Sequence, residues 1–430
     1  MIEVAKSFYL IALCALLAPS VSLGAGDSQR TGPWTLQECL STAMRNNIDV
    51  TSSANSLTIA RSRLTSANSS YLPQVSVQNT AFTWGDGGVL TKSSTGTAIS
   101  VDQNVYDGGL RETKAQGARY GVTQSSSALT RTYQSVTFSV TKAFYEALRA
   151  RHLAGVAEAN VKYNEGLRDQ VQGLADAGQS AKVDVLPVEA QLANSRVSLL
   201  SSQNTVRTSA LQLQSAMGIA SQPGFEVAEI ADPPKAEVGT LDGYVDSALK
   251  SRPDITQSQA ATGAARASVK SARISLYPRP VISASYQRQI SGGFTTSGTQ
   301  MVGGIAFDVF DGGANRAAYR QAEAERDNSQ AQEAELVRNV RSETEEAYLN
   351  LTNSRERLAA SAVSLEASKL NFDAQKERYG QGIGTTLDLL NAEVQLVTAQ
   401  STEVEARYDC YIAIAQLEYA VGGTGGQDER

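Results

Sequence analysis

The chain has 430 residues, of which 41% are hydrophobic and 6% aromatic, and its formal net charge is -6. Few aromatic residues and abundant Ala and Ser favour long helices packed through small side chains over large rounded cores. The negative charge excludes the basic surface that nucleic-acid binding requires, so no nucleic-acid partner is expected.

Residues 1–24 have the pattern of a secretory signal peptide. Lys6 precedes an apolar run from Phe8 to Ala18, and small residues follow near Ser22 and Gly24. No later run is long and apolar enough to predict a membrane-spanning helix. The mature chain is therefore expected to be periplasmic, secreted, or a β-barrel protein of the outer membrane.

The first half begins with a helix and continues with two strands. Thr35 and Glu38 have the spacing of a capping box, and an apolar helical pattern then runs to about Ser70. Pro73 ends this helix because proline cannot continue the hydrogen-bond ladder. Two strands are predicted next, at about residues 74–84 and 97–106, with a polar, glycine-rich loop between them.

A long helical hairpin follows these strands. Asp107-Gly108-Gly109 marks the change from strand to helix, since Asp caps helices and glycine permits the tight bend. The helix is predicted from Leu110 to about Ala175, a rod of about 100 Å at ~1.5 Å per residue. A small polar tip at about residues 177–182 reverses the chain, and a return helix ends near Met217-Gly218.

The same order of elements then repeats. A Pro-rich linker at residues 222–238 separates a first structural repeat, residues 25–221, from a second, residues 239–422. The second repeat has predicted strands at about residues 279–290 and 300–310, a tip at about residues 380–386, and after it a disordered tail at residues 423–430. Matching residues lie 204 or 205 positions apart: Thr35 and Thr240, Pro73 and Pro278, Asp107 and Asp311, Gly178 and Gly382, Asp184 and Asp388.

The predicted strands have the length of membrane strands. Each spans about 10 to 12 residues, enough to cross a bilayer when tilted. Their apolar residues alternate with polar ones, and these apolar positions are Ile99, Val101, Val105, Ile282, Ala284, Tyr286, Ile290, Met301, Ile305, Phe307 and Val309. An ordinary soluble hairpin gives the same alternation, but the signal peptide and the long rods favour membrane strands. Four strands cannot close a barrel, so an oligomer is expected, and a trimer would supply 12 strands.

The helices have coiled-coil spacing. Leu351, Leu358, Leu365 and Phe372 recur every seven residues, and the return helix alternates steps of three and four. Such a seam must be covered by sister helices.

These features resemble the TolC-like outer-membrane efflux proteins. The resemblance rests on Tyr71-Leu72-Pro73, Tyr277-Pro278, the paired Asp-Gly-Gly turns and the two Gly-centred tips, and it extends from about Trp34 to Gly422. It implies a mainly α fold with a small β part: a trimeric tunnel of 12 helices and a 12-stranded transmembrane barrel in the outer membrane of a Gram-negative bacterium, in contact with outer-membrane lipid.

The resemblance also implies a function. The trimer would passively conduct substrates as the exit duct of a tripartite efflux or type I secretion system, with a periplasmic adaptor (membrane fusion) protein and an inner-membrane transporter as partners. The alternative is a periplasmic adaptor or coiled-coil scaffold without its own channel. An adaptor normally carries one hairpin, whereas this chain has two.

Two sets of site residues follow from the resemblance. The adaptor would contact the tips, at Gly178, Gln179, Ser180, Gly382, Ile383, Gly384 and Thr385. A closed periplasmic gate would be held by a bond between Tyr379 and Asp184, and Asp388 would form an acidic ring whose second position is here Asn391. The gate Arg of the family and its hydroxyl partner are replaced by Gly384 and Val183. Together with Asn391, these departures imply an entrance that opens more easily or prefers cations less.

These gate residues also have simpler interpretations. Asp184 and Asp388 fit acids of a first helical turn, which the helix dipole favours, and Tyr379 fits a packed helical aromatic residue. The sequence has no catalytic constellation, so no enzyme activity, cofactor or metal site is expected; its one histidine, His152, should be solvated. Cys39 and Cys410 either form a disulfide or pack as small hydrophobic residues.

Overall fold

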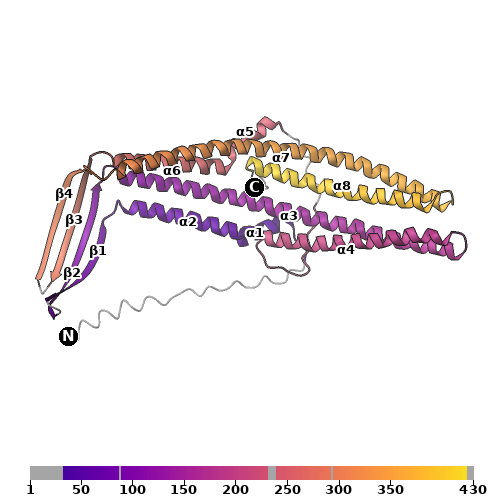
Figure 1. Cartoon of the computed structure of the whole chain (residues 1–430), viewed down its shortest axis with the longest axis horizontal. Coiled ribbons are helices and arrows are strands. Elements are labelled where there is room, and N and C mark those ends of the chain that lie inside the picture. Colours follow the sequence, from indigo (N-terminus) through magenta and orange to yellow (C-terminus); the bar gives the residue numbers. More distant parts are fainter. Residues whose placement is uncertain (1–31, 87–88, 231–238, 292–293, 424–430) are drawn as a thin grey trace.

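The computed structural model is a long, narrow molecule with a sheet at one end and two helical hairpins at the other (Figure 1). It describes residues 32–86, 89–230, 239–291 and 294–423, so the predicted signal peptide and most of the predicted tail lie outside the described residues. The described elements follow one order twice. They are α1 (Leu36–Asn46), α2 (Ile48–Ser69), β1 (Gln74–Asp86), β2 (Val89–Tyr106), α3 (Leu110–Asp176), a short 3-10 turn (Lys182–Asp184) and α4 (Val185–Ala216), then α5 (Leu241–Ser251), α6 (Pro253–Ile274), β3 (Arg279–Ser291), β4 (Phe294–Ala306), α7 (Ala314–Gly380) and α8 (Thr386–Val421).

The predicted first helix is broken in two at Asn47. This residue has extended backbone angles, and its Oδ1 accepts a hydrogen bond of 2.8 Å from the Asp49 backbone N–H, so it caps α2. Its Nδ2 also donates to the carbonyl of Ala216 at the end of α4, at 3.0 Å. An apolar pattern alone did not reveal this break, because Asn47 interrupts the backbone and not the apolar face.

Arg252 forms the corresponding joint in the second repeat. It lies between α5 and α6 and is 3% exposed; its guanidinium donates to both carboxylate oxygens of Asp254, to Glu343 at 2.7 Å and to the carbonyl of Ala420 at 3.3 Å. Both joints therefore hold the end of a return helix. At each joint this helix ends in a glycine with positive φ: a Cβ on Gly218 would lie 2.7 Å from the Asn46 carbonyl oxygen.

The main core lies near the middle of the long axis, where α1, α5 and the ends of α4 and α8 gather around α3 and α7 (Figure 1). Phe144 and Leu148 of α3 are fully buried there. Cys39 and Cys410 are buried in the same core and form no disulfide with each other, as the packed interpretation predicts. His152 is partly exposed, and its Nε2 lies 3.2 Å from Oε2 of the exposed Glu229.

The first part of the predicted linker is also folded against this core. The Trp34 N–H donates to the Glu226 carbonyl at 2.8 Å, and the Ala228 N–H donates to the Trp34 carbonyl at the same distance. Val227 is buried between them. Residues 231–238 of the linker lie outside the described residues.

The four strands form one antiparallel sheet in the order β1-β2-β3-β4. The register aligns their apolar residues on one face, because Val75 pairs with Val101, Val101 with Tyr286, and Ala284 with Met301. The opposite face is polar, with a hydrogen bond of 2.8 Å between Ser76 and Ser100. Nothing covers the apolar face in the described chain, and Met301 is 73% exposed.

Two predicted strands needed correction. β2 begins at Val89 and not near residue 97, because pairing with β1 satisfies the backbone of the Gly-, Ser- and Thr-rich segment that the sequence indicates as a loop. β4 spans 294–306 and not 300–310, because Asp308 and Asp311 belong to the turn into α7 and accept hydrogen bonds from Asn315. Val105 also leaves the expected alternation, since the register shifts between Asn104 and Tyr106.

No helix among the described residues has both the length and the apolar character needed to cross a membrane.

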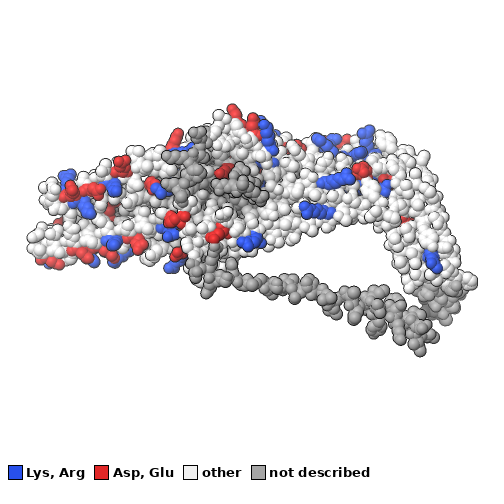
Figure 2. All heavy atoms as spheres, turned by 180° about the vertical axis from the view of Figure 1, so that it is seen from behind, with Lys and Arg blue, Asp and Glu red and all other residues white. Residues whose placement is uncertain are grey.

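Charged side chains are distributed unevenly along the molecule. Figure 2 shows few of them over the sheet and many over the helices, on the face that it displays. On this face the sheet therefore carries fewer charged side chains than the helices.

Candidate functional site

The first hairpin tip turns at a glycine, because the turn needs a positive φ that residues with a side chain rarely adopt. α3 ends at Asp176, and Gly178 has a φ of +72°, in the left-handed region. This turn lets the Gln179 N–H donate to the Leu174 carbonyl at 2.9 Å. Ser180 then donates through its Oγ to Asp184 Oδ2 at 2.8 Å, which joins the tip to the start of α4.

The second tip has the same design with a stronger helix start. Gly382 has a φ of +76°, and the N–H groups of Ile383 and Gly384 both donate to the Arg378 carbonyl. Thr385 and Asp388 form a capping box at the start of α8: the Asp388 N–H donates to Thr385 Oγ1 at 3.1 Å, and Thr385 Oγ1 donates to Asp388 Oδ2 at 2.6 Å. The hydrogen bond from Thr385 lowers the pKa of Asp388, which keeps this exposed carboxylate ionised.

The structure separates the predicted gate residues into two groups. Asp388 and Asn391 are exposed near the second tip. The expected bond between Tyr379 and Asp184 is not formed within the described chain. The Asp184 carboxylate instead accepts a hydrogen bond from Ser180. Tyr379 packs against the apolar cluster behind the tips, as the interpretation of a packed aromatic residue predicts.

This apolar cluster, named the tip cluster below, joins the two hairpins. Its buried members are Leu167, Val171, Ala175, Val185, Val188, Leu389 and Leu390. Tyr163 packs against it and meets Phe372 edge to face, with ring centroids 5.3 Å apart. Burial raises the pKa of Tyr163. Beside the tip cluster, Glu393 and Asn164 are almost completely buried and hydrogen-bonded to each other, a polar pair that the sequence analysis did not identify.

The hairpins also carry exposed apolar residues on two helices. Leu186, Val197, Leu200 and Leu211 form the α4 seam. Leu349, Val363 and Leu370 form the α7 seam. Leu200 is 68% exposed, whereas Val404, which matches it in the second repeat, is packed against the core. The expected seam at Leu351, Leu358, Leu365 and Phe372 is a different face of α7, and it is buried or half-buried within the chain. The α7 seam was not predicted.

The face of α8 that corresponds to the exposed face of α4 is buried. Leu390, which matches Leu186, is 7% exposed, while Leu186 is 60% exposed. Leu390 is covered because α3 packs against this face of α8. No described element packs against the corresponding face of α4, so Leu186 is exposed.

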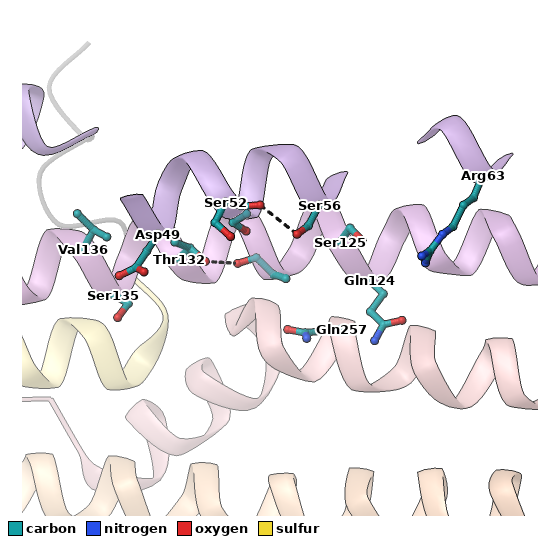
Figure 3. Close-up of a pocket in the computed structure, with 12 residues that line it drawn as sticks. Asp49, Ser52, Ser56, Arg63, Gln124, Ser125, Thr132, Ser135, Val136 and Gln257 are labelled. Atoms are coloured by element: carbon teal, nitrogen blue, oxygen red, sulfur yellow. Dashed lines mark hydrogen bonds between the residues drawn. The ribbon is translucent and has the colours of Figure 1, made fainter. Parts of the chain in front are cut away.

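A polar groove lies far from the tips, between α2, α3 and α6 (Figure 3). Its volume is about 660 Å³, and it is lined mainly by Ser, Thr and Gln side chains, with Asp49 and Arg63 of α2 as its charged residues. Small-molecule pockets are usually apolar and enclosed, so this groove is better suited to contact with water. In the part of the chain that the structure describes, no group of three or more His, Cys, Asp or Glu residues could hold a metal ion.

Comparisons with known proteins agree with this architecture. The family described as "Outer membrane efflux protein" matches residues 39–219 and 244–423. The outer membrane efflux protein BepC of Brucella suis is 25% identical over 422 residues, covering 96% of this chain and 90% of BepC. The pyoverdine export outer membrane protein OpmQ of Pseudomonas putida is 24% identical over 411 residues, covering 90% and 86%. A solved structure of the open state of the Neisseria gonorrhoeae MtrE outer membrane channel matches with a TM-score of 0.79 and 18% identity, covering 90% of this chain and 89% of MtrE.

Proposed function

Because the chain belongs to the outer membrane efflux protein family, we propose that three copies of it enclose one export duct. The chain lies in the outer membrane of a Gram-negative bacterium and extends into the periplasm. It conducts substrates outward as the exit duct of an efflux or type I secretion system.

The observation that carries the trimer is the pair of exposed seams. The hairpin helices are ordered α4, α3, α8, α7 in one chain (Figure 1). In the repeat, α7 corresponds to α3 and α4 corresponds to α8. The contact between α3 and α8 within the chain is therefore matched by a contact between α7 of one copy and α4 of the next, which would cover both seams.

The sheet supports the same assembly. β2 of the first repeat pairs with β3 of the second, and the corresponding pair is β4 of one copy with β1 of the next. Both edge strands are 13 residues long, and an unpaired edge leaves a row of backbone donors and acceptors without partners. Three sheets joined in this way give the 12-stranded barrel, whose apolar face would contact outer-membrane lipid.

The tips are proposed as the docking surface for a periplasmic adaptor, which links the duct to an inner-membrane transporter. Exposed apolar residues flank both tips: Val183 beside the first, and Ile383 and Leu387 beside the second. Such residues mark protein interaction sites when they cluster on a surface. The turns at Gly178 and Gly382 hold them at the end of the molecule.

The periplasmic gate is proposed at the level of Asp184, Tyr379, Asp388 and Asn391. Three Asp388 carboxylates around one axis would attract cations and repel anions. The capping box fixes where each carboxylate sits, and the lowered pKa keeps it charged.

Cysteine cross-linking tests the assembly directly. Val404, the match of Leu200, lines a groove with Val156 of α3, and Val156 corresponds to Ala360 of α7. Leu200→Cys combined with Ala360→Cys should therefore form disulfides between copies and give covalent trimers in outer-membrane fractions. Ser198→Cys with Ala360→Cys is the matched control, because position 198 lies on another face of α4.

Conductance in planar bilayers tests the duct. The purified trimer should conduct ions without an energy source. The proposal would be refuted by monomers that remain in solution after removal of the leader, together with the absence of any disulfide between copies in the Leu200→Cys, Ala360→Cys double variant.

A further inference from the structure

Asn164 of α3 and Glu393 of α8 form a buried polar contact between the two hairpins of one chain. Asn164 is 0% exposed and Glu393 is 2% exposed. Asn164 Nδ2 donates to Glu393 Oε1 and lies 3.1 Å from the Asn160 carbonyl oxygen. Glu393 is seven residues into α8, about 10 Å from the tip at ~1.5 Å per residue. The contact therefore lies beside the tip cluster, where separation of the hairpins would begin.

The hydrogen bonds of this pair are incomplete when Glu393 is ionised. Glu393 Oε2 and Asn164 Oδ1 are both buried without a partner, and both are acceptors. A buried carboxylate with one unpaired oxygen is costly. A proton on the carboxyl removes the charge and supplies the donor that these two side chains lack.

The surroundings favour the protonated acid. Burial raises the pKa of Glu393 to about 7, and the hydrogen bond from Asn164 opposes this shift. The ionisable group facing it from α3 is Tyr163, whose pKa is raised by burial and then by the charges of Glu393 and of Tyr379 on α7. α4 presents Val188 to the neighbouring tip cluster. Among the described residues, no ion pair joins Glu393 to a Lys, Arg or His.

We propose that Glu393 and Asn164 form a pH-sensitive clasp, which holds the two hairpins together when Glu393 is protonated and weakens when Glu393 is ionised. The clasp lies within one chain, whereas its effect on opening of the periplasmic end depends on the proposed duct. Acid would then favour the closed arrangement, and a neutral or alkaline periplasm would favour opening.

The pH window follows from the two pKa values. A solvated Glu ionises near 4.5, and the buried residue near 7. The clasp is therefore at full strength below the first value, weakens between the two, and stays weak above the second. Each pH unit in this window changes the equilibrium up to tenfold, so the closed arrangement loses on the order of 100-fold in preference.

The repeat shows why the clasp is confined to one kind of junction. Glu189 of α4 matches Glu393, and Ser368 of α7 matches Asn164. Glu189 is exposed in the chain, and a serine stands where the amide would be needed. In the proposed trimer, junctions with the clasp would alternate with junctions that lack it. A rise in pH would loosen only the junctions within chains.

Hydrogen exchange of the full-length protein in detergent micelles tests the clasp. Amides of residues 386–397, corrected for intrinsic rates, should exchange on the order of 100-fold faster at pH about 8 than at pH about 5. Glu393→Gln keeps the shape of the side chain and offers both a donor and an acceptor, but it carries no charge. The corrected exchange of this variant should therefore not change with pH. Glu189→Gln, the matched control, should behave as wild type.

A second measurement does not depend on exchange. The infrared carbonyl band of a protonated carboxylic acid should be present in wild type and Glu189→Gln at acid pH, and it should lose the Glu393 contribution in Glu393→Gln. Identical pH profiles for wild type and Glu393→Gln, or no difference in this band, would overturn the clasp. If Glu393 titrates as proposed but conductance does not change with pH, the role of the clasp in opening is overturned. Absence of any conductance would contradict the duct alone.

Discussion

Leu200→Asp should prevent or weaken assembly, because Leu200 is the centre of the α4 seam. The side chain is 68% exposed in one chain and would be covered by α7 of the next copy. Full burial of a leucine contributes ~1.5–3 kcal/mol, so burial of two thirds of this side chain contributes ~1–2 kcal/mol at each contact. Three contacts per trimer give ~3–6 kcal/mol. Burial of three carboxylates adds a further cost in the variant.

The assay compares Leu200→Asp with Ser198→Asp by native mass analysis and by heat-modifiable migration in detergent gels. Ser198 is exposed, and its match in the second repeat, Thr402, is exposed on α8 as well. The control thus adds the same charge two residues away on a face that stays in water. Equal trimer stability in the two variants would refute the assignment of the α4 seam to the contact between copies.

Three further predictions concern the joints and the tips. Gly218→Ala should lower the free energy of unfolding by ~2–4 kcal/mol and Gly178→Ala by ~1–2 kcal/mol, because both residues have positive φ but only at Gly218 would a Cβ meet backbone atoms; equal losses in thermal unfolding would contradict the clash. Arg252→Met should cost ~1–3 kcal/mol because it removes the donor to the buried Ala420 carbonyl and to the partly buried Asp254, whereas the exposed pair of Arg196 should lose no more than ~1 kcal/mol in Arg196→Met; the same thermal measurement checks this ranking. Asp388→Asn keeps a capping oxygen but removes the charge, so single-channel reversal potentials should shift toward lower cation preference, more at neutral pH than below the lowered pKa of the carboxyl; an unchanged reversal potential would exclude the acidic ring.

The duplicated elements could be predicted from the sequence because they depend on local signals. Asp107-Gly108-Gly109 and Asp311-Gly312-Gly313 mark the starts of α3 and α7, which begin at Leu110 and Ala314. These turns need positive φ at both glycines and an Asp that accepts backbone hydrogen bonds, and neither requirement depends on distant residues. The tips at Gly178 and Gly382 were predictable for the same reason.

Features that depend on distant partners could not be predicted in this way. The segment before residue 97 has the composition of a loop, and it becomes strand because β1 supplies hydrogen-bond partners along it. The break at Asn47 depends on the Ala216 carbonyl, 169 residues away. Glu393 was visible in the sequence as one residue of a helical repeat. Only its packing against Asn164 makes it a buried acid.

The differences between the two repeats are therefore more informative than their similarities. Some matching residues have the same structural role in both repeats. Asn47 and Arg252 both donate hydrogen bonds to the last turn of a return helix, at the carbonyls of Ala216 and Ala420. Glu189 and Glu393 differ in role, because Glu189 is exposed and Glu393 is buried. A duplicated chain that closes into a trimer makes each contact once within a chain and once between chains. Residues that differ across the repeat thus distinguish these two kinds of contact, and such positions are where opening can be controlled without loss of assembly.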